Sequence, residues 1–153
     1  MCVEITTKIA ELLLSCKTIA VVGLSRDKNK DSHRVAEFLK ECGKKIIPVN
    51  PFAKGKEILG ETCFGSLGEI PEQVAGEIEV VDVFRPSEEI EGIAIELVKL
   101  KKEGKFGKLR VFWMQLGIEN EEAKKVCVEN GIEVVKNKCV KIELEKLLGT
   151  KSN

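Results

Sequence analysis

Short continuous apolar runs and apolar stripes at helical spacing follow one another along this chain. Each run is rich in β-branched and aliphatic residues, which is typical of a strand buried on both faces in a parallel sheet. The runs that predict strands cover residues 18–22, 46–49, 79–84, 109–113 and 132–135. The stripes predict amphipathic helices. These helices are expected at 4–15, from a cap at Ser32 to a stop at Gly43, around 90–98, at 119–130 and at 140–148.

The alternation of strands and helices predicts the fold class. We expect an α/β fold: a Rossmann-like, doubly wound parallel sheet of about five strands with helices on both faces. The chain should form a single domain over residues 1–149, with helix 4–15 as an N-terminal extension and 150–153 as a frayed tail. Residues 50–72 are rich in glycine and proline, which predicts an irregular stretch with one short strand near 62–64.

Composition narrows the function classes. The 153 residues are 43% hydrophobic, enough for one core. The 25 basic and 25 acidic residues cancel, so the net charge attracts neither nucleic acid nor an anionic membrane. No apolar run approaches the roughly 20 residues of a membrane span, and we expect a cytoplasmic protein. The six cysteines include no CxxC pair, so no metal site is predicted and the thiols should be reduced and mostly buried.

Ligands of doubly wound sheets bind at the carboxyl ends of the strands. After the first predicted strand, Gly23 is the only glycine where a dinucleotide fingerprint has three. The loop is instead rich in hydroxyls and cations, and the helix that follows has an N-terminus that attracts phosphate. These side chains belong to Ser25, Arg26, Lys28, Lys30, Ser32 and Arg34. We favour an anion site here; the alternative is a solvated basic loop with Asp27 and Asp31 as counter-charges.

The second predicted strand ends at Asn50-Pro51, where an NAD site usually has an acidic residue that binds the ribose hydroxyls. Without that carboxylate, a phosphorylated ribose such as that of coenzyme A or NADP is better tolerated. The alternative is that Pro51 simply terminates the strand and Asn50 supports the turn.

Two further strand ends carry polar side chains. Arg85 directly follows the apolar run that ends at Phe84, and it should either meet an anion or leave the sheet for solvent. Gln115 follows the fourth strand and could donate to, or accept from, a ligand amide. The alternative for Gln115 is a loop amide satisfied by the protein itself.

No complete catalytic site is predicted. His33 is the only histidine, and it has no placed carboxylate or thiol partner. The chain contains no GxSxG, Walker A or HExxH motif. Cys139 precedes the last predicted helix, whose N-terminus can lower a thiol pKa, although a packed cysteine explains this position as well.

Taken together, these segments resemble the stand-alone CoA-binding protein family, a relative of the N-terminal domain of the succinyl-CoA synthetase alpha subunit. The resemblance covers nearly the whole chain. It rests on Ile19-Ala20-Val21-Val22-Gly23-Leu24-Ser25-Arg26, Ser32-His33-Arg34-Val35, Ile47-Pro48-Val49-Asn50-Pro51, Gly60, Val81-Asp82-Val83-Phe84-Arg85, Trp113-Met114-Gln115-Leu116-Gly117 and residues 137–143.

The resemblance implies that coenzyme A, free or acylated, lies over the strand ends. Its phosphates would lie by the Gly23 loop, its adenosine near Asn50 and Pro51, and its pantetheine toward Gln115. The cofactor-binding residues expected on this basis are Gly23, Leu24, Ser25, Arg26, Lys30, Ser32, Arg34, Asn50, Pro51, Phe84, Arg85, Gln115 and Gly117, with Cys139 as a candidate thiol contact.

The function expected from these observations is a CoA-binding module: a carrier, a sensor, or a subunit that presents CoA to another protein. The ligase reaction of the synthetase is not expected, because that enzyme needs a phosphorylated histidine and a nucleotide-grasp partner. Two alternatives stay open, an NADP-linked oxidoreductase and a thiol-redox protein in which Cys139 forms a mixed disulfide with CoA. The first helix could also serve a homodimer contact.

Overall fold

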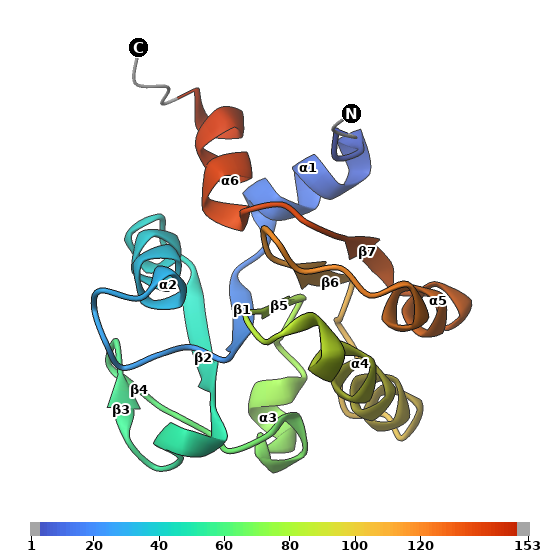
Figure 1. The fold of residues 1–153 in the computed structure, drawn as a ribbon, viewed down its shortest axis with the longest axis horizontal. Helices are drawn as coiled ribbons and strands as arrows, with labels where there is room; N and C mark the ends of the chain where they lie inside the picture. Colours follow the sequence, from blue (N-terminus) through green and yellow to red (C-terminus); the bar gives the residue numbers. More distant parts are fainter. Residues whose placement is uncertain (1–3, 150–153) are drawn as a thin grey trace.

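The computed structural model describes residues 4–149, and its centre is a five-stranded parallel sheet in the order β2-β1-β5-β6-β7 (Figure 1). The strands are β1 (Thr18–Val22), β2 (Lys45–Val49), β5 (Val80–Val83), β6 (Val111–Met114) and β7 (Glu133–Val135). The five predicted strands and the α/β fold class are therefore confirmed, and each strand begins and ends within two residues of its prediction.

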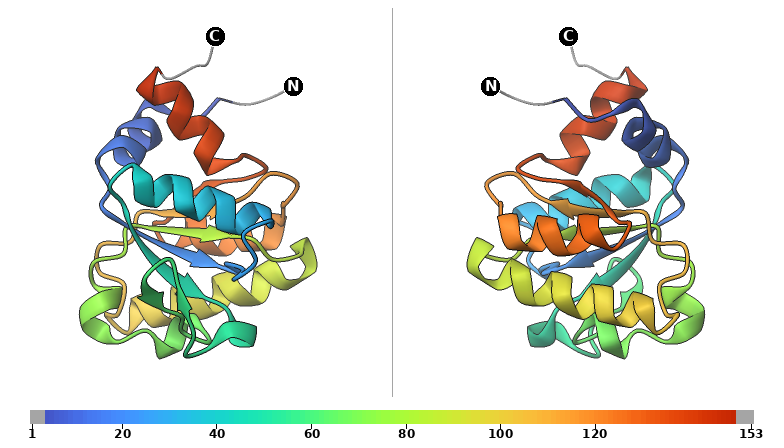
Figure 2. Two further views of the ribbon diagram at one scale, coloured as in Figure 1. Left: turned by 90° about the vertical axis from the view of Figure 1, so that its left-hand side faces the viewer. Right: turned by 90° about the vertical axis from the view of Figure 1, so that its right-hand side faces the viewer.

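Helices cover both faces of the sheet, as predicted (Figure 2). One face packs against α1 (Thr7–Ser15), α2 (Asp31–Glu41) and α6 (Val140–Leu148). The other packs against α4 (Ser87–Lys102), α5 (Glu121–Glu129) and the short α3 (Glu72–Ala75). Successive strand residues alternate between the two apolar clusters, because side chains along a strand point to opposite faces. None of the helices in residues 4–149 combines the length and the apolar content that crossing a membrane requires.

The segment after β2 contains more regular structure than its composition predicted. It forms a 3-10 turn η1 (Pro51–Ala53), a two-stranded antiparallel hairpin of β3 (Glu57–Ile58) and β4 (Glu61–Thr62), and a second turn η2 (Leu67–Glu69). The predicted strand at 62–64 is wrong in extent, because only Thr62 lies in a strand and Phe64 makes an isolated parallel bridge with Val49.

The predicted cap of the second helix is also wrong. Helix α2 begins at Asp31, its N-cap residue is Lys30, and no side chain caps it. The Ser32 hydroxyl instead accepts a hydrogen bond from the backbone N–H of Ser25 at 3.0 Å. In contrast, α1 does have a hydroxyl cap, since the Thr6 Oγ1 accepts from Ile9 N at 3.1 Å.

Helix α1 is joined to the sheet by a buried lysine. The Lys44 ammonium donates to the carbonyls of Leu13, Leu14 and Cys16 at 2.8, 3.1 and 2.7 Å. The last carbonyls of a helix lack partners within the helix and lie at the negative end of its dipole, so a cation there is favourable. Lys44, only 7% exposed, therefore satisfies the end of α1 from the start of β2.

No disulfide joins the cysteines among residues 4–149, and their redox state stays a prediction. Cys16, Cys63 and Cys127 are buried, Cys42 is exposed and Cys139 is half-buried. Cys2 and the predicted frayed tail at 150–153 lie outside the described residues.

The strand order places a switch point beside β1. This strand pairs with β2 on one side and β5 on the other, both in parallel. The chain leaves β1 toward β2 and later returns to the opposite side, so the loops after β1 and β5 diverge at their carboxyl ends. Ligands of open α/β sheets bind in such a crevice.

Candidate cofactor site at the carboxyl ends of the strands

Gly23 allows the end of β1 to lie directly against the end of β5. Its φ is +89°, a conformation that residues with a side chain rarely adopt. A Cβ at this position would lie 2.6 Å from the Phe84 carbonyl oxygen and 3.0 Å from Cδ of Arg85. The Gly23 N–H donates to Val49 O at 2.7 Å, so this residue joins the ends of three strands.

Local hydrogen bonds shape the loop that follows Gly23. Ser25 Oγ accepts from Asp27 N at 3.0 Å, and the Asp27 carboxylate accepts from Asn29 N at 2.9 Å. The buried His33 holds the loop from helix α2, with Nδ1 2.8 Å from the Ser25 carbonyl oxygen. Because a carbonyl oxygen only accepts, Nδ1 is the protonated nitrogen. This contact gives His33 a positioning role in the loop.

The loop leaves several donors available to an anion. Within residues 4–149, the backbone N–H groups of Leu24 and Arg26 have no hydrogen-bond acceptor. The side chains of Arg26 and Lys30 have no ion-pair partner there either, whereas Arg34 pairs with Asp31 and donates to Asn29 O at 2.6 Å. Unpaired backbone N–H groups and cations before a helix N-terminus are the components of a phosphate site.

Asn50 connects the end of β2 to the Gly23 loop. Its Nδ2 donates to Leu24 O at 2.9 Å, and its Oδ1 accepts from Phe52 N at 2.9 Å. Both side-chain atoms therefore support the turn, which is the alternative that the sequence left open, and contact with a cofactor stays a prediction. The aromatic ring of Phe52 is 84% exposed just beyond Pro51. Phe52 was not predicted as a site residue, although an aromatic directly after Asn50-Pro51 was the available signal.

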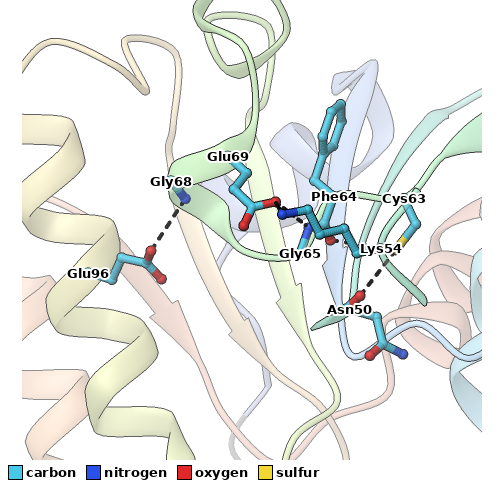
Figure 3. Close-up of polar contacts among 8 residues, drawn as sticks. All are labelled: Asn50, Lys54, Cys63, Phe64, Gly65, Gly68, Glu69 and Glu96. Atoms are coloured by element: carbon cyan, nitrogen blue, oxygen red, sulfur yellow. Dashed lines mark hydrogen bonds and ion pairs between the residues drawn. The ribbon is translucent and has the colours of Figure 1, made fainter. Parts of the chain in front are cut away.

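Polar contacts fix the segment beyond Asn50 (Figure 3). Cys63 Sγ lies 3.6 Å from Asn50 O, and Lys54 pairs with Glu69 at 3.2 Å. The hydrogen bond from Lys54 is the main reason that the Glu69 pKa is lowered. Glu69 also accepts from the backbone N–H of Gly65 at 3.1 Å. These contacts join the end of β2 to the segment around Cys63 and link Lys54 to the turn at Gly65 and Glu69.

Arg85 is paired within the protein. Its Nε and Nη2 donate to the two carboxylate oxygens of Glu89, in the first turn of α4, at 2.9 and 3.0 Å. The side chain is only 27% exposed, so it does not extend into solvent. An anionic ligand would compete with Glu89 for the guanidinium. A ligand phosphate would have to replace Glu89 to bind this guanidinium.

Gln115 connects the end of β6 to the N-terminus of α6. It is 4% exposed, and its Oε1 accepts from Val140 N at 3.0 Å. Its amide nitrogen has no partner among the described residues. Nearby, Gly117 has φ +85° and donates its N–H to Asn137 Oδ1 at 2.7 Å. The oxygen of Gln115 is thus used structurally, and its NH₂ group remains for a ligand.

A groove of about 560 Å³ lies between α2 and α6 at the strand ends. Four predicted residues line it: Arg34, Phe84, Gln115 and Cys139. Asn50, Pro51, the Gly23 loop, Arg85 and Gly117 do not line it, so only part of the predicted set lies in this groove. The molecule has another cavity, of about 330 Å³, between α1 and β7, but none of the predicted residues lines it.

Asp82 is a notable residue that the sequence analysis did not single out. It lies in the middle of β5, between Val21 and Trp113 in register, and is 0% exposed. Neither carboxylate oxygen has a hydrogen-bond partner. Burial raises the pKa of Asp82 well above its ordinary value. An acidic residue inside an apolar run was the available signal.

Comparison with known protein families gives a match over most of the chain. Residues 17–145 match the family described as CoA binding domain. The Bacillus subtilis protein named "Uncharacterized protein YneT" is 39% identical over 135 residues, which is 88% of this chain and 90% of that protein.

Solved structures give the same result for the fold. The Thermus thermophilus protein cell-free ID.343 has a TM-score of 0.81 and 32% identity, with 94% of this chain and 99% of that chain covered. A hypothetical protein from Pyrococcus horikoshii OT3 has a TM-score of 0.80 and 34% identity, with 95% and 94% covered.

Proposed function

Because this chain belongs to the CoA binding domain family, we propose that it binds coenzyme A across the carboxyl ends of β1, β2, β5 and β6. The observation that carries this proposal is the loop after Gly23. It combines a glycine that no other residue can replace without a clash, unpaired backbone N–H groups, and unpaired cations beside the start of α2. The diphosphate of CoA lies in this loop.

The two ends of the cofactor extend to either side of the loop. The adenosine lies near Asn50 and Pro51, where the exposed Phe52 ring offers a surface for stacking on adenine. No acidic residue stands at the end of β2 to repel a ribose phosphate. The pantetheine follows the groove between α2 and α6, where the free amide nitrogen of Gln115 can donate to a carbonyl.

The biological role is that of a carrier, a sensor, or a subunit presenting CoA to another protein, without a reaction of its own. The hydrogen bond from His33 to the Ser25 carbonyl supports this view, because it commits the one imidazole to loop structure. The protein would act in the cytoplasm.

Calorimetry on ligand-free protein tests the proposal with CoA, dephospho-CoA, NADP and NAD. We expect CoA to bind more tightly than dephospho-CoA, since the 3′-phosphate contributes contacts of its own. Equal affinity for the two compounds would contradict the placement of the 3′-phosphate. Binding of NADP in place of CoA would support an oxidoreductase instead.

A matched pair of variants tests the phosphate loop. Arg26→Gln should weaken CoA binding about tenfold, the usual effect of losing one hydrogen bond to a charged group. Arg110→Gln changes an exposed arginine just before β6, at the opposite end of the sheet, and should leave CoA affinity unchanged. Equal effects of the two substitutions would exclude a specific role for Arg26.

The position of Cys139 supports a second candidate function, thiol exchange with CoA. Cys139 is the N-cap residue of α6 and lines the groove proposed for pantetheine. On incubation with CoA disulfide, the Cys139 thiolate should attack one sulfur, break the S–S bond and release one CoA thiol, so that the wild-type protein carries the other CoA as a reducible adduct detectable by mass spectrometry. An adduct of the same yield on Cys139→Ser would exclude this thiol.

A further inference from the structure

The groove between α2 and α6 has an unusually apolar wall for a solvent-accessible surface. Leu116 is 64% exposed and Ile142 is 45% exposed, and both line this groove together with Phe84 and Ile118. Single exposed apolar side chains are common on proteins, but several around one concave surface indicate a binding site. The lining includes Ile142 in the first turn of α6.

Among the five charged residues that line the groove, the two without an ion-pair partner in the described part of the chain are both acids. Glu37 and Glu41 lie one turn apart on α2, and neither has an ion-pair partner in residues 4–149. The cations at the groove are engaged. Arg34 pairs with Asp31, and Lys141 pairs with Glu145 at 3.4 Å while its ammonium lies 5.2 Å from the centre of the Phe38 ring. A ligand carboxylate in this groove would meet repulsion.

Gln115 gives the groove a polar point at its inner end. Its amide nitrogen has no protein acceptor, and the residue is 4% exposed and lines the groove beside Cys139. An acceptor on the ligand pairs with this group once the ligand shields it from water. A thioester or pantetheine carbonyl provides such an acceptor, and the acyl chain then continues along the apolar wall.

We infer that this groove holds the acyl group of an uncharged, apolar acyl-CoA, which the protein prefers over free CoA and over CoA thioesters of dicarboxylic acids. The inference rests on the proposed function and names its ligand class. The apolar wall stabilises the chain, Gln115 binds a carbonyl near the sulfur, and Glu37 and Glu41 repel a terminal carboxylate.

Calorimetry with CoA, acetyl-CoA, butyryl-CoA and succinyl-CoA tests the inference. Each methylene buried in full adds about fourfold in affinity, so a partly open groove should add about two- to threefold per methylene. Butyryl-CoA, with two more methylenes, should therefore bind about four- to ninefold more tightly than acetyl-CoA. Succinyl-CoA, similar in length but charged, should bind at least about tenfold more weakly than butyryl-CoA.

Two variants with matched exposure locate the effect. Ile142→Ser removes an exposed side chain from the groove and should reduce the gain from acetyl-CoA to butyryl-CoA to about twofold or less. Ile95→Ser changes an isoleucine of α4 that is 49% exposed and outside this groove, and it should leave the gain intact. The double variant Glu37→Gln, Glu41→Gln should reduce the difference in affinity between butyryl-CoA and succinyl-CoA.

The outcomes separate the two proposals. The acyl inference is overturned if CoA binds but butyryl-CoA binds no more tightly than acetyl-CoA. It is also overturned if Ile142→Ser shows the same gain in affinity from acetyl-CoA to butyryl-CoA as the wild type. The proposed function stands in both cases. If neither CoA nor any thioester binds, the proposed function is wrong and the inference falls with it.

Discussion

The buried carboxyl of Asp82 should make the stability of this protein depend on pH in an unusual direction. The side chain is fully buried among apolar residues, and no hydrogen bond or charge compensates its ionised form. Burial raises its pKa well above the ordinary value, so the folded protein holds a proton that the unfolded chain releases. Asp82→Asn keeps the shape and removes the titration.

The sign follows from proton binding. Between the ordinary carboxyl pKa and the raised folded-state pKa, the folded state binds more protons than the unfolded state, so the free energy of unfolding falls as pH rises. Each pH unit in that interval lowers it by about 1.4 kcal/mol. The stabilisation from this bound proton is fully present below about pH 4 and decreases as the pH rises from 4 to the folded-state pKa. An Asn at this position has no such slope, although its amide still lacks partners.

Urea unfolding of the wild type and Asp82→Asn, followed from pH 4 to pH 8, measures the difference. Relative to the wild type, the free energy of unfolding of the variant should rise by about 1.4 kcal/mol per pH unit, up to the folded-state pKa of Asp82. Asp27→Asn, the same change in the exposed loop, is the control and should follow the wild type. A difference between Asp82→Asn and the wild type that stays constant across this range would refute the reasoning.

Three other changes have expected outcomes. Gly23→Ala should lower the free energy of unfolding by at least about 2 kcal/mol more than Gly43→Ala, because both have φ near +90° but only Gly23 lacks room for a Cβ; equal losses in urea would contradict this. Lys44→Met should cost about 1–3 kcal/mol by leaving buried carbonyls unpaired, whereas the exposed Lys45→Met should cost little. Burial raises the pKa of the Cys127 thiol to about 12, so alkylation at pH 8, followed by mass spectrometry, should reach it only after urea is added.

The sheet was predictable because each of its strands is a short and largely apolar run, interrupted inside β5 only by Asp82, as expected for strands covered by helices on both faces. The boundaries were less so: the run at 109–113 starts with Leu109, which is buried but precedes β6. The hairpin of β3 and β4 was not foreseen, since two-residue strands carry no periodicity. The cap at Ser32 failed because the hydroxyl is used by the loop of Ser25, seven residues earlier.

The candidate site was predictable in its location and less so in its contacts. Topology alone places the residues after Val22, Val49, Val83 and Met114 at one edge of the sheet. Which donors remain free depends on partners distant in sequence. Arg85 is engaged by Glu89, and Gln115 uses its oxygen on the start of α6, so neither side chain's availability could be read from its own segment.

Lys44 also bears on where this protein can be cut. The residues that match the family begin at 17, after the end of α1. Yet the ammonium of Lys44 reaches back across that boundary to three carbonyls, and Ile9 and Leu13 complete the apolar cluster under the same face. A chain trimmed to residues 17–145 would keep the lysine and lose the carbonyls that it binds. We therefore expect the cooperative folding unit to extend one helix beyond the residues that match the family, with the amide protons of α1 exchanging together with those of β1 rather than in advance of them.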